Sequence, residues 1–190
     1  MRSQRIVWAA ITACVAIAAC QKYTDTPGVD DPRLHNRFYC NTPDAVNYNW
    51  DFPGTPDSTK CVFPSDVFKG HYYYVDSIYN ADGSSLLKQD TLQFDIQALN
   101  RTHISLTGFC GSGNGATIAL TATRTFRAQV DTVAAIVKGQ LLCRPLDTLS
   151  GYFIASQDST SGILARRLKF SFTVLSDTGS TEHRGTAIKQ

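Results

Sequence analysis

The side chains of this 190-residue chain that could carry out chemistry are six cysteines and four histidines. No C-x-x-C, H-E-x-x-H or H-x-x-x-H pair occurs, so the sequence predicts no metal site and no cofactor. No G-x-S-x-G turn is present, and no paired carboxylates stand apart from the turn regions. We therefore identify no catalytic residue and expect that the protein is not an enzyme. Surface positions on strands are expected for the histidines, which are His35, His71, His103 and His183.

The cysteines indicate disulfide bonds. Four of them follow residue 20, at Cys40, Cys61, Cys110 and Cys143. An even number in an exported chain is typical of two disulfides, and four cysteines allow three connectivities. Proximity along the chain favours Cys40 with Cys61 and Cys110 with Cys143.

The first nineteen residues have the order of a secretion signal. Arg2 and Arg5 precede an apolar run from Ile6 to Ala19. As a helix this run would be roughly 20 Å long, which is shorter than the ~30 Å hydrocarbon core of a bilayer. We therefore expect a removable signal and no permanent transmembrane helix.

The end of this signal, Ile17-Ala18-Ala19-Cys20, resembles the lipobox of bacterial lipoproteins. The resemblance implies that residues 1–19 are removed and that Cys20 carries a diacylglyceryl group and a fatty acid such as palmitate. It implies a protein of the cell envelope whose partner is the membrane, expected at the outer membrane on its periplasmic face or at the cell surface. Ordinary cleavage after Ala18, which would give a secreted protein, is the alternative.

Removal of the signal also changes the charge. Residues 1–19 contain two arginines and no acidic residue, so the mature chain has equal numbers of basic and acidic side chains. Nucleic-acid binding needs a surface with an excess of basic side chains, and the mature chain has no such excess. We therefore expect no nucleic-acid partner. About 170 residues remain, enough for one sizeable hydrophobic core.

Two polar segments precede the core. Residues 20–37 have no apolar period and are expected to form a flexible tether. Residues 38–64 contain Cys40-Asn41-Thr42-Pro43-Asp44-Ala45-Val46-Asn47-Tyr48-Asn49 and end in Cys61-Val62-Phe63-Pro64. This segment resembles a short cysteine-bounded repeat of secreted and surface bacterial proteins, in which an acidic turn separates C-x-D-P-x-A-x-N-Y-N from C-x-Y-P. Thr42 replaces the first Asp of that pattern and the acidic turn is reduced, so a disulfide-closed loop is favoured over a cation site.

Residues 65–190 have the period of two that is typical of half-buried strands. The alternation is clearest from Leu92 to Ala98 and from Leu168 to Val174. Strands are expected near 71–79, 92–98, 102–109, 116–127, 133–142, 149–156, 168–175 and 183–189. Short turns separate them, which favours an all-β antiparallel meander, folded either as an up-and-down barrel or as a two-sheet sandwich. Phe68-Lys69-Gly70-His71-Tyr72 resembles the start of lipocalin-like barrels, which implies the barrel.

Aromatic residues are the candidates for ligand binding. Tyr72, Tyr74 and Trp50 could stack on a sugar or line an apolar cavity, whereas core filling by alternate tyrosines is the alternative. The sequence therefore favours a lipid-anchored binding or accessory module for a small ligand, a glycan or an envelope protein. The alternative is an envelope hydrolase whose catalytic residues are scattered along the chain.

Overall fold

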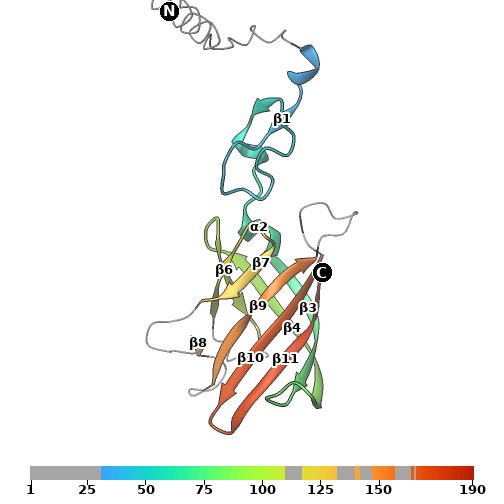
Figure 1. Ribbon diagram of the computed structural model, residues 1–190, viewed down its shortest axis with the longest axis vertical. Helices are drawn as coiled ribbons and strands as arrows, with labels where there is room; N and C mark the ends of the chain where they lie inside the picture. The colour runs from blue at the N-terminus through green and yellow to red at the C-terminus, as the bar shows by residue number, and fades with distance from the viewer. Residues whose placement is uncertain (1–30, 110–116, 132–139, 142–146, 157–163, 165) are drawn as a thin grey trace, which may run out of the picture.

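The computed structural model describes residues 31–109, 117–131, 140–141, 147–156, 164 and 166–190. Within these ranges the chain forms a closed antiparallel barrel below a small segment of loops and short elements (Figure 1). No helix in the described part is long and apolar enough to cross a membrane.

Eight described strands close the barrel in the order β3-β4-β5-β6-β7-β9-β10-β11, and β11 pairs again with β3. The closing contacts exclude the sandwich and confirm the barrel. The strands are β3 (Gly70–Tyr79), β4 (Leu86–Ala98), β5 (His103–Thr107), β6 (Ile118–Ala122), β7 (Arg127–Val130), β9 (Thr148–Ser156), β10 (Arg167–Ser176) and β11 (Gly179–Lys189). The short β8 (Gln140–Leu141) pairs with the beginning of β9 beyond the end of β7.

The predicted single strand over 116–127 is wrong. The chain turns after Ala122 and begins β7 at Arg127, and both strands point apolar side chains inward. Phe126 takes a φ of 60°, and the Thr123 hydroxyl donates to the Arg127 carbonyl at 3.0 Å. These contacts make a tight turn from residues that have ordinary strand propensity. Of the strand predicted at 133–142, the described residues show only β8, because 132–139 and 142 lie outside them.

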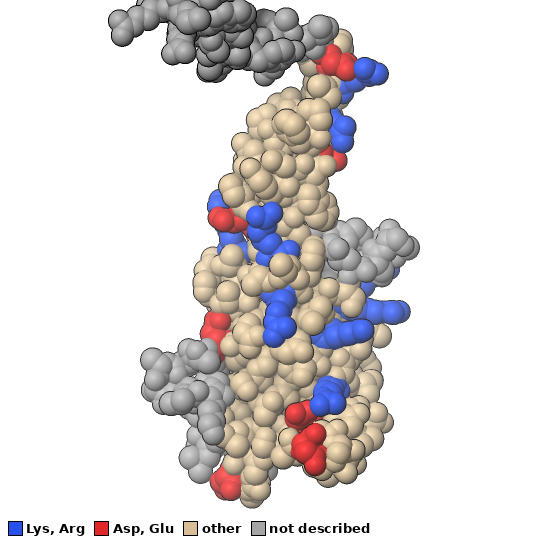
Figure 2. Space-filling model, in the orientation of Figure 1, with Lys and Arg blue, Asp and Glu red and all other residues tan. Residues whose placement is uncertain are grey.

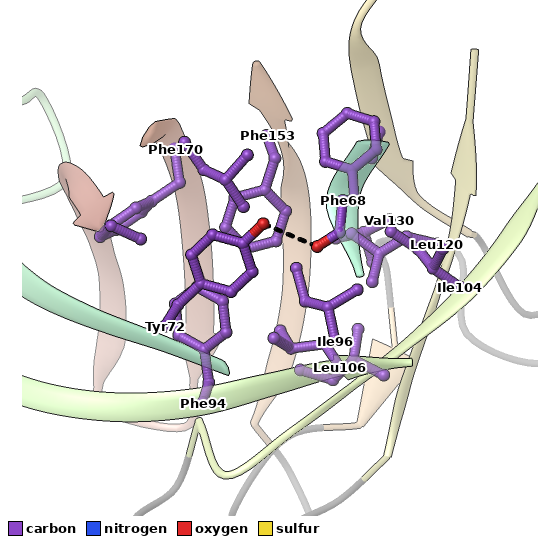
Figure 3. Close-up of a cluster of buried hydrophobic side chains, with 14 of the residues drawn as sticks. Phe68, Tyr72, Phe94, Ile96, Ile104, Leu106, Leu120, Val130, Phe153 and Phe170 are labelled. Carbon is purple, nitrogen blue, oxygen red and sulfur yellow. Dashed lines mark hydrogen bonds between the residues drawn. The ribbon is translucent and has the colours of Figure 1, made fainter. Parts of the chain in front are cut away.

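The barrel interior is filled by side chains from the inward positions of every barrel strand. Aromatic rings occupy its middle: the ring centroids of Phe153 and Phe172 lie 4.9 Å apart, and those of Tyr74 and Phe94 lie 5.1 Å apart. Figure 3 shows several of these rings converging from different strands. This is the packing expected when an eight-stranded barrel closes around its own side chains.

A short helix covers one end of the barrel. Helix α2 (Pro64–Phe68) begins with a proline at its first turn, and the Asp66 carboxylate accepts a hydrogen bond from the Phe63 amide at 3.0 Å. Val67 and Phe68 are fully buried, and the Phe68 carbonyl accepts a hydrogen bond from the Tyr72 hydroxyl at 2.8 Å (Figure 3). The expectation that the strand pattern begins at residue 65 is therefore wrong for residues 65–68. These residues belong to α2 and close this end of the barrel.

Residues 38–64, here called the cap segment, pack above this end. The segment contains two-residue strands β1 (Phe38–Tyr39) and β2 (Thr55–Pro56) and the 3₁₀ helix η2 (Ser58–Lys60), and the 3₁₀ helix η1 (Pro32–Leu34) precedes it. Val46 belongs to the core of the barrel, and the guanidinium of Arg101 lies 4.5 Å from the centroid of the Phe63 ring. The cap segment and the barrel are thus in direct contact.

Candidate functional site

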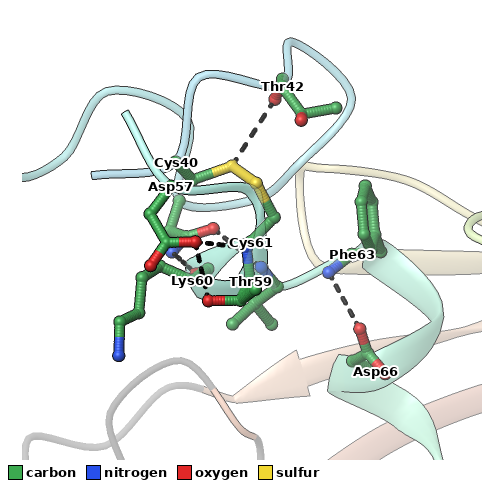
Figure 4. The surroundings of a disulfide bond; sticks show 10 residues. Cys40, Thr42, Asp57, Thr59, Lys60, Cys61, Phe63 and Asp66 are labelled. Atoms are coloured by element: carbon green, nitrogen blue, oxygen red, sulfur yellow. Dashed lines mark hydrogen bonds between the residues drawn. A yellow bond between two sulfur atoms is a disulfide. The ribbon is translucent and has the colours of Figure 1, made fainter. Parts of the chain in front are cut away.

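The disulfide predicted for the cap segment is confirmed. Cys40 and Cys61 are bonded, and their Cα atoms lie 4.8 Å apart (Figure 4). The pairing predicted for Cys110 with Cys143 lies outside the described residues, as does the lipid site predicted at Cys20. Both stay predictions.

The polar side chains of the cap segment bind its own backbone. Asp57 accepts hydrogen bonds from the hydroxyl and the amide of Thr59 at 2.7 and 2.8 Å, and these two bonds lower the pKa of the Asp57 carboxyl (Figure 4). The Asn47 amide donates to the Lys60 carbonyl at 2.7 Å and accepts from the Val62 amide at 2.9 Å. These side chains cap the backbone of their own loop, as expected for the disulfide-closed loop that the sequence favours. No group of three acidic, histidine or cysteine side chains in the described ranges could hold a metal ion.

The three aromatic candidates do not come together. Tyr72 and Tyr74 are fully buried in the barrel, where burial raises the pKa of both phenols. Trp50 lies on the cap segment with 54% of its surface exposed. The two tyrosines occupy the core-filling positions that the sequence left as the alternative, while Trp50 remains available to a partner.

A row of polar side chains lies inside the barrel at the end away from α2. The Asp76 carboxylate is hydrogen-bonded to Nδ1 of His183 at 2.6 Å, and Nε2 of His183 lies 3.2 Å from the Thr181 hydroxyl. The side chains of Asp76 and His183 are 3% and 12% exposed, so the surface position expected for His183 is wrong. The other Asp76 oxygen and the Tyr74 hydroxyl are buried without a hydrogen-bond partner among the described residues. The negative charge of Asp76 adds to burial in raising the pKa of Tyr74.

Among the described residues, two shallow depressions stand out on the outer face of the barrel. One, of about 660 Å³, lies over β3 and β4 beside an exposed pair in which Nδ1 of His71 is 2.8 Å from the Asp95 carboxylate. The other, of about 530 Å³, is formed by β3, β9, β10 and β11 and is here called the outer depression. It combines aromatic and cationic side chains, namely Tyr79, Tyr152, Lys169 and Arg184.

Arginine side chains stack on both tyrosines of the outer depression. The Arg184 guanidinium lies 5.3 Å from the Tyr79 ring centroid and pairs with Glu182, while the Arg127 guanidinium lies 3.7 Å from the Tyr152 ring. The stacking holds each guanidinium against an aromatic surface. Nη2 of Arg127 donates to the Gln129 side chain and Nη2 of Arg184 donates to Glu182, so the remaining N–H groups are the ones that can face a ligand. Figure 2 shows basic side chains gathered around the middle of the face that carries β9, β10 and β11. An aromatic surface with cations beside it suits a ligand that has both rings and negative charge.

Comparisons with known proteins give few likenesses. No model of a protein family matches this sequence, and no curated protein matches it. Among solved structures, a redesigned beta barrel is 17% identical with a TM-score of 0.39, and the likeness covers 67% of this chain and 95% of that one. A structural-genomics protein of unknown function from Bacteroides ovatus is 14% identical with a TM-score of 0.38, and the likeness covers 87% of this chain and 52% of that one.

Proposed function

We propose that this protein is a lipid-anchored module of the cell envelope that binds an acidic glycan on the outside of its barrel. The observation that carries the proposal is the outer depression, where two arginine-stacked tyrosines and a lysine share one solvent-facing surface. The barrel interior is filled by buried aromatic and aliphatic side chains, so a ligand is better received on the outer face. The anchor itself rests on the lipobox-like sequence around Cys20.

The chemistry of the outer depression favours a charged sugar over a neutral one. Guanidinium and ammonium groups bind carboxylates through charge-assisted hydrogen bonds, whereas the stacked arginines cover one face of each tyrosine and leave less aromatic surface for a neutral sugar. Lys169 and Arg184 lie on neighbouring strands, β10 and β11, and their side chains leave the same face of the sheet. A uronic acid in a chain of sugars offers both the ring and the carboxylate.

Reversing one charge should test this site. Lys169→Glu should weaken binding of an oligogalacturonate by about tenfold or more, because an attractive charge beside the carboxylates becomes repulsive. Lys88→Glu is the matched control, since Lys88 is an exposed lysine on β4 outside the outer depression. Titration calorimetry of the full chain measures both variants, with a neutral oligosaccharide of equal length as the reference ligand. Equal affinity of Lys169→Glu and Lys88→Glu, or a preference for the neutral sugar, would contradict the acidic-glycan site.

The buried row of Asp76, His183 and Thr181 favours a second candidate, an envelope hydrolase. In this order the Thr181 hydroxyl would be the nucleophile and His183 the base that takes its proton. Asp76 would hold His183 in the required tautomer. In that case a phosphonofluoridate should phosphonylate the Thr181 oxygen, with fluoride leaving and the hydroxyl proton passing to His183. Mass spectrometry of wild type and His183→Gln checks this. A Thr181 that stays unmodified in the wild type, or that reacts equally in His183→Gln, would remove the hydrolase.

A further inference from the structure

The cap segment exposes three large aromatic side chains. Phe38, Trp50 and Phe52 are 43%, 54% and 62% exposed. These three residues are here called the cap aromatic patch because they share one segment. Phe52 meets Tyr39 edge to face with the ring centroids 5.5 Å apart. The salt bridge at 3.9 Å between Arg37 and Asp51 ties the loop that carries Trp50 and Phe52 to the beginning of β1. The three exposed rings thus belong to one small, disulfide-closed segment.

This patch lies at the end of the molecule that also carries η1. In Figure 1 the cap segment stands at the end opposite the β3–β4 hairpin. Twelve positions separate Cys20 from Pro32, the first residue of η1. Even a fully extended chain of that length spans only about 40 Å, so a lipid on Cys20 would keep η1, which leads into the cap segment, within that distance of the bilayer.

We propose that the cap aromatic patch docks on the headgroup region of the bilayer that holds the Cys20 lipid. This inference rests on the proposed anchor. Tryptophan and other aromatic rings favour the interface between lipid and water, where an apolar ring and a polar edge are both accommodated. A lipid chain combined with a second contact gives firmer attachment than the lipid alone. Docking would also fix the direction in which the barrel points away from the membrane.

The charge of the cap end indicates that the contact is made by the rings and not by electrostatic attraction. Residues 31–64 hold almost balanced charges, with basic side chains at Arg33, Arg37 and Lys60 and acidic side chains at Asp31, Asp44, Asp51 and Asp57. A surface whose charges are balanced gains little binding free energy from anionic lipids. Docking should therefore occur on zwitterionic bilayers and should persist when the salt concentration is raised.

Trp50 provides a direct probe, because it is the one tryptophan left once residues 1–19 have been removed. The lipidated full-length mature protein is reconstituted in phosphatidylcholine vesicles with bromine atoms placed either shallow or deep on the acyl chains. We expect the shallow bromines to quench Trp50 fluorescence severalfold more than the deep ones, and iodide in the water to quench it little. The double variant Trp50→Phe, Leu87→Trp moves the probe to an exposed site on β4, far from the cap segment, where bromolipids should have no effect.

The outcomes separate this inference from the anchor. Intact mass shows whether Cys20 carries lipid, and a protein without lipid would overturn both the anchor and the docking. A lipidated protein whose Trp50 is quenched by iodide and not by bromolipid would overturn the docking alone. Shielding of Trp50 that appears without vesicles and grows with protein concentration would assign the patch to a second copy of the chain and overturn membrane docking. Loss of bromolipid quenching in Phe38→Ser, Phe52→Ser would support it.

Discussion

Gly151→Ala should lower the free energy of unfolding of the barrel by about 2 to 6 kcal/mol. Gly151 has a φ of +138°, which residues with side chains rarely adopt, and it lies on β9 facing β10. A Cβ atom at this position would lie 2.2 Å from the Ser171 carbonyl oxygen and 2.6 Å from the Phe172 ring. The substitution therefore strains the backbone and also overfills the interior, and urea unfolding followed by circular dichroism measures the loss.

Two other glycines separate the strain from the crowding. Gly179 has the same φ of +138° in the β10–β11 hairpin, and a Cβ atom added there would meet nothing within 4 Å, so Gly179→Ala tests strain alone. At Gly185 no positive φ occurs, but a Cβ would lie 2.1 Å from the Val75 carbonyl oxygen and 2.7 Å from the Phe170 ring. We expect Gly179→Ala to cost the least and Gly151→Ala the most. Equal losses for Gly151→Ala and Gly179→Ala would show that crowding by Ser171 and Phe172 contributes nothing.

The double variant Cys40→Ser, Cys61→Ser should destabilise the cap segment by about 2 to 5 kcal/mol while the barrel stays folded. The disulfide joins residues 21 positions apart, and in the chain-entropy model a loop of that size is worth about 3 kcal/mol. The cap segment has few buried apolar residues, namely Cys40, Ala45, Val46 and Pro64, and Val46 packs in the core of the barrel, so little else within the segment opposes its opening. Hydrogen exchange of the cap amides measures the change, and circular dichroism follows the barrel.

The matched control for this variant is Cys110→Ser, Cys143→Ser. It also removes two cysteines but should leave hydrogen exchange in the cap segment unchanged, because neither residue belongs to that segment. Non-reducing peptide mapping of the wild type tests the predicted bond between Cys110 and Cys143 at the same time. Cap amides that exchange as slowly in Cys40→Ser, Cys61→Ser as in the wild type would show that barrel contacts alone hold the cap segment.

Local periodicity was enough to predict most of the barrel. In β4 and β10 inward apolar residues alternate with outward polar ones, because one face of each strand packs inside and the other meets water. The β6–β7 turn escaped prediction for a physical reason: its residues, Thr123 to Phe126, include no glycine, proline or asparagine. The turn is held by threonine hydroxyls and by a phenylalanine with positive φ, and neither feature has a signal in the residue pattern.

The candidate sites were much harder to predict because they are assembled across strands. Asp76 and His183 are 107 positions apart, and only the pairing of β3 with β11 brings them together. The outer depression likewise draws Tyr152 from β9 and Lys169 from β10. In the sequence, each of these residues looks like an ordinary residue of a strand. Trp50 is the candidate that sequence reasoning placed outside the barrel strands, and it lies exposed on the cap segment.

The pairing of β3 with β11, here called the β3–β11 seam, affects the order in which the barrel folds. Most barrel strands pair with a neighbour that lies close in sequence, whereas this seam joins residues such as Tyr72 and Lys189. Closing a loop of more than a hundred residues costs about 4 kcal/mol of chain entropy, considerably more than closing a hairpin. Hairpins such as β10–β11 can therefore form early, and the seam gains its hydrogen bonds only after the intervening strands have aligned. Until these hydrogen bonds form, β3 and β11 each present a long unpaired strand edge, which is open to pairing with another chain.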